Sequence, residues 1–228
     1  MHILIVLTSH DRLGGSGSKT GSGLEEFCAA YYVFKDAGAE VTLASPTGGQ
    51  PPIDPQSNGL GDRSEMVKRF KTDQAARTAL ADTLELEQVA PEDFDAVFYV
   101  GGHGAMWDLP EDPISRALIA AVHAAGRPLA LVGHGPAALR YVVDAGGRPL
   151  VEGRRVTASA NSEEAAMGLT ESLPFFLQDE LVRLGGIYSK GPEGMSHVVR
   201  DGALITGQNR DSAADAANAV LEILRRSE

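Results

Sequence analysis

The sequence predicts an α/β protein in which helices sandwich a doubly wound, mostly parallel sheet, formed as a single domain by residues 1–228. Apolar runs of strand length alternate along the chain with segments of helical periodicity. The runs are continuously aliphatic, as in strands that are buried on both faces of a parallel sheet. A chain of 228 residues can bury one such sheet between two helical layers but is short for two independent domains.

The expected elements follow one another in alternating order. Strands are predicted at 3–7, 40–44, 94–100, 128–132 and 155–160, with two short strands at 197–200 and 203–206 joined by a two-residue turn, Asp201-Gly202. Helices are predicted at 24–37, 65–81, 114–125, 162–168, 174–184 and 212–226. In a sheet of this kind ligands bind beyond the carboxyl ends of the strands, so the loops at those ends are the candidate site.

Composition limits the classes of function. The net charge of −11 argues against nucleic-acid and anionic-membrane partners, which require a basic face. We expect a cytoplasmic protein, because no apolar run is long enough to span a membrane and no signal sequence is recognisable. Cys28 is the only cysteine, and the six histidines show no metal-binding spacing, so we expect neither a metal nor a cofactor. The glycine- and serine-rich stretch 10–23 matches no phosphate-binding motif.

The most informative stretch is the turn after the strand 128–132. The apolar run stops at Gly133-His-Gly-Pro136 and is followed by an alanine-rich segment that is expected to be helical. A strand–turn–helix of this kind displays one residue at a helix N-terminus, where unpaired N–H groups favour negative charge. The displayed residue is Gly133, which has no side chain, so the turn is built like one that carries a nucleophile and lacks the nucleophile.

These motifs resemble the ThiJ/PfpI superfamily, with its class I glutamine amidotransferase-like fold. Within it they are most similar to the branch of the glutathione-independent glyoxalase III enzymes and related heat-shock chaperones. The matching segments are residues 20–21, 24–27, 44–49 with 52–55, 101–104 with Asp108, 133–136 and 204–209. The resemblance implies a flavodoxin-like arrangement of the sheet and a homodimer with a contact near residues 20–27.

The resemblance also implies a site. The superfamily carries a reactive cysteine at the position of Gly133, so this is a vacated nucleophile position. His134 corresponds to the histidine that follows the cysteine, Glu164 to the acidic partner of that histidine, and Glu26 to the glutamate that hydrogen-bonds the thiolate. Cys28 cannot replace the nucleophile, because two residues along a helix turn the side chain by about 200° away from Glu26. Cys28 is therefore expected to fill the core.

Further residues are expected around the pocket. The oxyanion or substrate-binding groups are Gly102, His103 and Gly135, together with the N–H groups around Gly133 and His134; His103 has a purely structural hydrogen bond as its alternative. Gly23 and Ser159 stand where the branch usually carries aromatic side chains, which suggests a widened pocket. Trp107 either lines the rim of this pocket or packs under the following helix.

Three functions are compatible with these observations. The favoured one is an enzyme that has no catalytic cysteine and uses Glu26 and His134 for cofactor-independent acid–base chemistry. Its reaction would be of the lyase, hydratase, isomerase or cyclisation type on a bulky, largely apolar small metabolite. The alternative is a glyoxalase III or deglycase-type enzyme, converting for example methylglyoxal to lactate, whose cysteine has been removed by mutation. The third is a non-catalytic ligand-binding or chaperone-like protein.

Overall fold

The sheet of the computed structural model, which describes residues 1–56 and 64–227, has seven strands among the described residues. Their spatial order is β3 (Leu84–Glu85), β2 (Glu40–Ser45), β1 (His2–Val6), β4 (Ala96–Tyr99), β5 (Leu129–Val132), β9 (Leu204–Gly207) and β8 (Val198–Asp201). All neighbours pair in parallel except β8, which runs antiparallel to β9. The predicted doubly wound fold is thereby confirmed.

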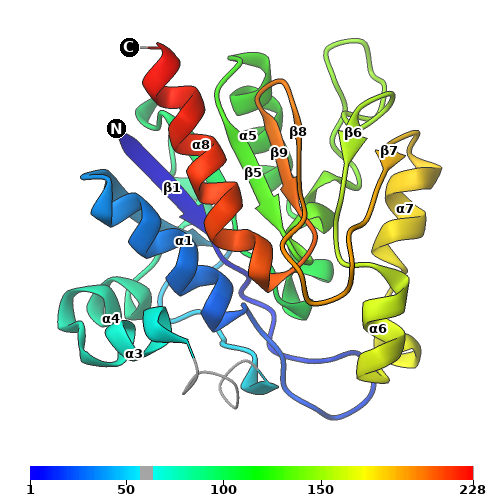
Figure 1. Cartoon of the computed structure of the whole chain (residues 1–228), viewed down its shortest axis with the longest axis horizontal. Coiled ribbons are helices and arrows are strands. Elements are labelled where there is room, and N and C mark those ends of the chain that lie inside the picture. Colours follow the sequence, from blue (N-terminus) through cyan, green and yellow to red (C-terminus); the bar gives the residue numbers. More distant parts are fainter. Residues whose placement is uncertain (57–63, 228) are drawn as a thin grey trace.

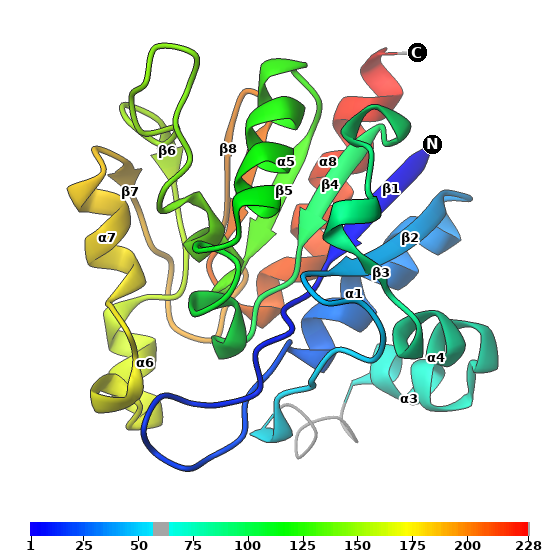
Figure 2. The ribbon, with the colours of Figure 1, turned by 180° about the vertical axis from the view of Figure 1, so that it is seen from behind.

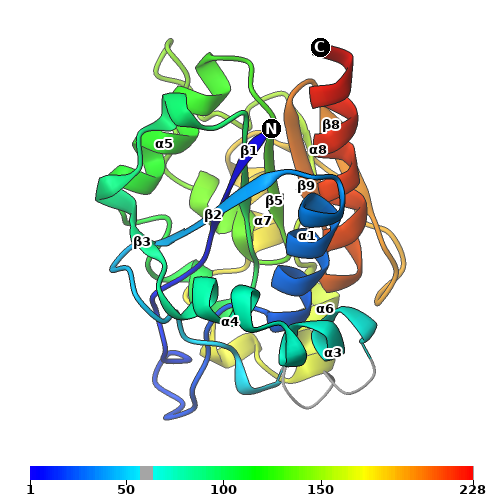
Figure 3. The same ribbon diagram turned by 90° about the vertical axis from the view of Figure 1, so that its left-hand side faces the viewer.

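Helices cover both faces of this sheet. One face is covered by α1 (Leu24–Asp36), α3 (Glu65–Thr72), α4 (Gln74–Ala81) and α8 (Ala213–Ser227), which lie in front in Figure 1. The opposite face carries α5 (Pro113–Ala124), seen in front in Figure 2. Figure 3 shows the sheet edge-on between the two layers. Alternate residues of β1 serve the two cores: Ile3 and Ile5 pack under α1 and α8, and Leu4 and Val6 pack on the side of α5.

A smaller group of elements lies beyond the β8 edge. It contains α6 (Asn161–Met167), α7 (Leu177–Arg183) and a separate two-stranded parallel sheet of β6 (Arg155–Val156) and β7 (Ile187–Tyr188). The first residues of α6 bring Glu164 toward the carboxyl ends of β4 and β5. Both chain termini lie at the opposite end of the sheet, away from that region (Figure 1).

Three predicted elements differ from the structure. The helix expected at 65–81 is broken into α3 and α4 at Asp73, whose carboxylate accepts a hydrogen bond from the N–H of Ala76 and so caps α4. The strand expected at 155–160 ends at Val156, because the next N–H groups bond a threonine side chain and the turn at Gly133 instead of a strand ladder. The hairpin register pairs Asp201 with Leu204, so the turn residues are Gly202 and Ala203.

The segment after β5 is also different from its prediction. Residues Gly135–Leu139 form a short 3₁₀ helix instead of the start of an α-helix. The dipole of a regular helix therefore makes little contribution at Gly133. The backbone of the turn itself is as expected, since Gly133 has φ +58°, the left-handed conformation that only glycine adopts without strain.

Two further expectations concern the surface of the molecule. None of the helices in the described part of the chain combines the length and the apolarity that a membrane span requires. The segment 20–27, expected near a dimer contact, is buried within the chain except at Glu25 and so offers little surface to a second copy.

Candidate active site

A cavity opens at the carboxyl ends of β4 and β5, where the candidate residues were expected. Its volume is about 510 Å³. Its wall includes three glycines of the turns, at positions 23, 102 and 133, and the side chains of Glu26, His103, His134 and Ser159. It is completed by Glu25, Asp54, Gln56, Glu163, Ala166, Met167, Glu193, Gly194, Asn209, Arg210 and Asp211. Among the described residues only Ala166 and Met167 contribute purely apolar side chains, yet most of the exposed surface of the cavity is formed by carbon atoms.

Glu26 enters the cavity from the first turn of α1. The start of this helix is fixed to the turn after β4, because the N–H of Gly23 donates to the carbonyl oxygen of Gly101 over 3.0 Å. The Glu26 side chain is buried, and its Oε2 atom has no hydrogen-bond partner among the described residues. Burial raises the pKa of Glu26 to about 8, although the positive charges of His103 and Arg210 oppose the shift. At neutral pH the group is mainly a carboxylic acid that can donate a hydrogen bond.

The carboxyl group of Glu26 is surrounded by three glycines. A Cβ atom on Gly23 would stand 2.5 Å from Oε2, and one on Gly101 would stand 2.6 Å from the same oxygen. A Cβ atom on Gly133 would overlap Oε1. The space expected to be open at positions 23 and 133 is therefore filled in part by Glu26, which corrects the idea that these two glycines simply widen the pocket.

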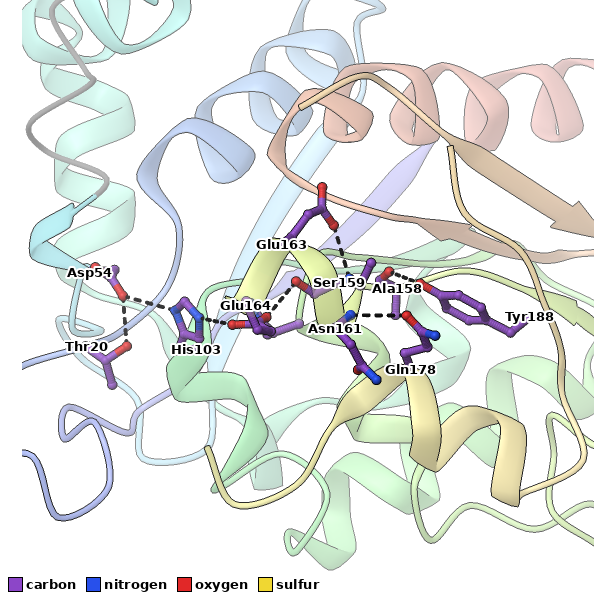
Figure 4. Close-up of polar contacts among 12 residues, drawn as sticks. Thr20, Asp54, His103, Ala158, Ser159, Asn161, Glu163, Glu164, Gln178 and Tyr188 are labelled. Carbon is purple, nitrogen blue, oxygen red and sulfur yellow. Dashed lines mark hydrogen bonds and ion pairs between the residues drawn. The ribbon is translucent and has the colours of Figure 1, made fainter. Parts of the chain in front are cut away.

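The two histidines come from neighbouring strand ends. His103 follows β4 and His134 follows β5, and the parallel pairing of these strands brings the imidazole rings to a centroid distance of 4.0 Å. Glu164 of α6 lies between them: its Oε2 is 3.0 Å from His103 Nε2, and its Oε1 is 2.5 Å from His134 Nε2. Ser159 donates its hydroxyl to Glu164 Oε1 over 2.8 Å. Figure 4 shows Glu164 between His103 and Ser159.

Asp54 extends this network on the other side of His103. Its Oδ2 lies 3.8 Å from His103 Nδ1 and accepts the hydroxyl of Thr20 over 2.8 Å (Figure 4). Backbone hydrogen bonds between Ser22 and the segment 52–54 hold the loop against the start of α1 and so place this carboxylate. Apart from its place in a matching motif, Asp54 could not be predicted as a site residue, because its contact with His103 joins residues that are far apart in the chain.

The two histidines of this network differ in their protonation. Burial alone would lower the pKa of His103, but its contacts with Asp54 and Glu164 raise that pKa to about 9. Burial would likewise raise the pKa of Glu164, but the two histidines hold it well below its usual range. Burial and the neighbouring His103 charge lower the pKa of His134. At neutral pH the group is a His103 imidazolium between two carboxylates, beside a neutral His134.

The backbone donors only partly match the expected oxyanion pocket. The N–H of Gly133 donates to the carbonyl oxygen of Gly207 over 2.9 Å, so it is not available to a ligand. Within the residues that the structure describes, the N–H groups of Gly102 and His134 have no protein acceptor. Gly102 has φ +103° and lies on the cavity wall, so its turn depends on glycine.

Two of the expected pocket residues lie elsewhere. Trp107 is not part of the wall; its ring stacks on His10 with a centroid distance of 5.0 Å, and it packs against the core on the α5 side. Gly135 faces β4 instead, where a Cβ atom would stand 2.9 Å from the carbonyl oxygen of Tyr99. Cys28 is fully buried among α1 core residues, and burial raises its pKa to about 12, so it is an unreactive thiol.

Several residues at the mouth of the cavity were not predicted from the sequence. Arg210 lies 3.4 Å from the carboxylate of Glu25 and 3.7 Å from that of Asp211. Asn209 donates to Glu163 over 2.9 Å. Asn209 belongs to the matching segment 204–209, which was the only available signal that the loop after β9 reaches the site.

The chain is similar to a known family and to proteins of solved structure. The model of the DJ-1/PfpI family matches residues 20–223. The glutathione-independent glyoxalase hsp3101 of Schizosaccharomyces pombe is 33% identical over 91% of this chain and 88% of its own length. The solved structure of glyoxalase III from Candida albicans has a TM-score of 0.89 at 28% identity, covering 97% of this chain and 96% of its own. That of the Rapid Encystment Protein 24 kDa from Francisella tularensis has a TM-score of 0.93 at 35% identity, covering 98% of each chain.

These relatives correct the function favoured from the sequence. Acid–base chemistry of lyase or hydratase type on a bulky, largely apolar metabolite is wrong, because curated relatives that match 91–98% of the chain are glutathione-independent glyoxalases. The alternative of a glyoxalase III-type enzyme fits better. The family match over residues 20–223 and the similarity of these relatives along nearly the whole chain show that this protein belongs to the DJ-1/PfpI family.

Proposed function

We propose that the chain has the active-site pocket of a glutathione-independent glyoxalase, which binds small 2-oxoaldehydes such as methylglyoxal. In this chain glycine occupies position 133, where the family carries its reactive cysteine. The names and coverage of the relatives support the substrate class. The residues that take part are Glu26, His103, His134 and Glu164, with Gly102 at the oxyanion position.

The observation that carries the proposal is the carboxyl group of Glu26. It is buried, its Oε2 atom has no hydrogen-bond partner within the described part of the chain, and it lies directly against Gly133 on the cavity wall. A buried polar atom without a partner costs free energy of about 1–3 kcal/mol, which a ligand that hydrogen-bonds it recovers. A carboxyl group beside the nucleophile position is also the group that a glyoxalase reaction requires, because a proton must move between two adjacent carbon atoms.

With a thiol at position 133 the reaction is an isomerisation followed by hydrolysis. The sulfur adds to the aldehyde carbon and forms a hemithioacetal. Glu26 takes the proton from that carbon and returns it to the neighbouring keto carbon, passing through an enediol. The product is a 2-hydroxyacyl thioester, which water cleaves to the 2-hydroxy acid. The His103 imidazolium and the N–H of Gly102 stabilise the negative oxygen of the enediol intermediate.

Restoring the thiol tests the proposal. Gly133→Cys should convert methylglyoxal to lactate without any added thiol, and Gly133→Ala should not. The alanine variant is the matched control, because it has the same Cβ atom and the same backbone strain and lacks only the sulfur. A folded cysteine variant, verified by circular dichroism and by a free-thiol count of two, that produced no more lactate than the alanine variant would refute the proposed function.

A further inference from the structure

We infer that the unmodified chain acts on the adduct of a 2-oxoaldehyde with a low-molecular-weight thiol, so that the sulfur arrives with the substrate. The inference rests on the proposed function, because it keeps the same pocket and the same proton transfer. It adds a thiol as the second component of the substrate. This requirement differs from that of the relatives named glutathione-independent glyoxalases. An enzyme that carries its own thiol does not require one from solution.

Glu26 lies where a side chain on residue 133 would need space. In the structure its Oε1 atom lies too close to the position of a Cβ atom on Gly133 for both to be present without a shift. A side chain on residue 133 must push this carboxyl group aside, whereas a thiol from solution adds no Cβ atom at that position. The backbone of Gly133 is part of the cavity wall, so an external sulfur can lie against it with the adjacent carbon beside Glu26. The structure is therefore compatible with a thiol from solution without rearrangement.

The cavity is larger than methylglyoxal alone requires. Its volume of about 510 Å³ lies within the range of roughly 300–1,000 Å³ that is typical of pockets for drug-sized ligands. Methylglyoxal fills only a small part of such a volume. The hemithioacetal of methylglyoxal with a small thiol fills more of it and displaces more water. The cavity extends from Gly133 past Ser159 to Met167 and Arg210, which gives the thiol substituent a path toward the mouth.

The conversion of the hemithioacetal to a thioester is an isomerisation that only moves protons. In the hemithioacetal the carbon bonded to sulfur carries one hydrogen and one hydroxyl group, and the neighbouring carbon is a ketone. Glu26 in its ionised form removes the hydrogen as a proton and delivers it to the ketone carbon, while the hydroxyl proton passes to the ketone oxygen. The result is a 2-hydroxyacyl thioester, formed without an external oxidant or reductant. Hydrolysis then releases the 2-hydroxy acid and regenerates the thiol.

The electrostatics of the site suit this proton transfer. A carboxylate whose pKa is near 8 is a stronger base than an ordinary one, and its burial beside Gly133 removes competing water. The cation at His103 lies on the same wall, where it stabilises the enediolate oxygen. Its charge persists because Asp54 and Glu164 flank it on both ring nitrogens.

The mouth of the cavity indicates which thiols are accepted. Among the residues that the structure describes, four carboxylates stand there, from Glu25, Glu163, Glu193 and Asp211, against one guanidinium, Arg210. Arg210 is already shared by Glu25 and Asp211 through ion pairs. This excess of negative charge disfavours an anionic thiol. An uncharged thiol such as 2-mercaptoethanol should therefore form a better adduct substrate than mercaptoacetate, which is of similar size and carries a carboxylate.

The experiment uses the full chain with methylglyoxal that has been equilibrated with 2-mercaptoethanol, with mercaptoacetate or with no thiol. Thioester formation is followed by its ultraviolet absorbance, and lactate is assayed at the end. The unmodified chain should form product only when a thiol is present, with a rate that saturates in the adduct and is higher for 2-mercaptoethanol. Glu26→Gln should lower this rate by at least about 100-fold. Cys28→Ala should leave it unchanged, because Cys28 is buried in the core away from the cavity.

The outcomes separate this inference from the proposed function. An unmodified chain that is inactive with both adducts, next to a Gly133→Cys variant that is active without thiol, overturns the inference and leaves the function intact. Turnover by the unmodified chain that is the same with and without thiol also overturns it. If neither the unmodified chain with adduct nor the cysteine variant without thiol is active, the proposed function fails and the inference fails with it.

Discussion

The carboxyl group of Glu26 occupies the space that a Cβ atom on Gly133 would need. The two residues come from different elements, α1 and the turn after β5, and they compete for one position on the cavity wall. In a relative that carries a side chain at this position, the glutamate must lie differently. Glycine at position 133 is thus compatible with the observed conformation of Glu26, and a side chain there requires the carboxyl group to move.

Substitution of Gly133 should lower the stability of the fold. A side chain at φ +58° is strained by about 1–3 kcal/mol, and it must also displace the Glu26 carboxyl group. We expect the free energy of unfolding to fall in Gly133→Ala and Gly133→Cys by similar amounts. It should fall further in Gly133→Val, because a β-branched residue tolerates this region least. Urea denaturation measures the series, and equal midpoints and slopes for all four proteins would show that the turn is unstrained.

The buried Glu26 should make stability depend on pH. Its pKa in the folded chain is raised to about 8, above the value of 4.5 in the unfolded chain. The folded state therefore holds its proton where the unfolded state loses it. The contribution of Glu26 to stability is fully present below pH 4.5 and is lost as the pH rises to about 8, at up to about 1.4 kcal/mol per pH unit.

The variant Glu26→Gln isolates this effect, because glutamine has a similar shape and does not ionise. Denaturation of both proteins should show that the advantage of the glutamine variant over the unmodified chain grows between pH 5 and pH 8. A difference in unfolding free energy that stayed constant over this range would mean that Glu26 titrates normally and is not buried as a neutral acid.

The imidazole of His103 should remain protonated well above the usual range. Its pKa is raised to about 9 by Asp54 and Glu164. In an NMR titration of the histidine ring signals, His103 should titrate near pH 9, whereas His134 should stay neutral near pH 7 because its pKa is lowered. Removing one neighbouring charge with Asp54→Asn should move the His103 transition downward. A His103 transition near pH 6.5 in the unmodified chain would show that its pKa is not raised.

Loss of the charge on Glu164 should be costly, because two imidazoles and a serine hydroxyl depend on it. We expect Glu164→Gln to lower the free energy of unfolding by on the order of 3 kcal/mol, since it leaves a buried cation with one counter-charge. The neighbouring Glu163→Gln is the control. Its Oε2 accepts from the N–H of Ala160 and its Oε1 from Asn209, and glutamine can accept only one of these two bonds, so a smaller loss of about 1 kcal/mol is expected. Similar losses in both variants would argue against a special role of Glu164.

The sequence predicted the strands and the turns of this site more reliably than the contacts between its side chains. The strand β1 and the helix α1 follow from apolar periodicity, and the position of Gly133 at a strand end follows from the same pattern. The break at Asp73 was not predicted, because the apolar periodicity continues from α3 into α4. The chain changes direction only locally, where Asp73 caps the second helix. The exclusion of Trp107 from the cavity depends on its stacking with His10, a contact that no spacing in the sequence reveals.

The features of the site that could not be predicted from the sequence are long-range polar contacts. The pair of His134 and Glu164 could be predicted through the resemblance to a family, but not the second contact of Glu164 with His103 or the approach of Asp54 to the other side of that ring. Both depend on how loops from distant parts of the chain close over the sheet. The overlap of Glu26 with the position of a Cβ atom on Gly133 depends on how the side chain of Glu26 is placed, which only coordinates define.

The central claim is that Glu26 moves the proton in a glyoxalase reaction once a sulfur is beside it. The most direct measurement is the rate of lactate formation from methylglyoxal by Gly133→Cys, compared with the double variants that add Glu26→Gln or, as a control, Glu40→Gln at the exposed start of β2. The rate of Gly133→Cys should be retained with Glu40→Gln and should fall at least about 100-fold with Glu26→Gln. Equal rates in the three proteins would contradict the claim.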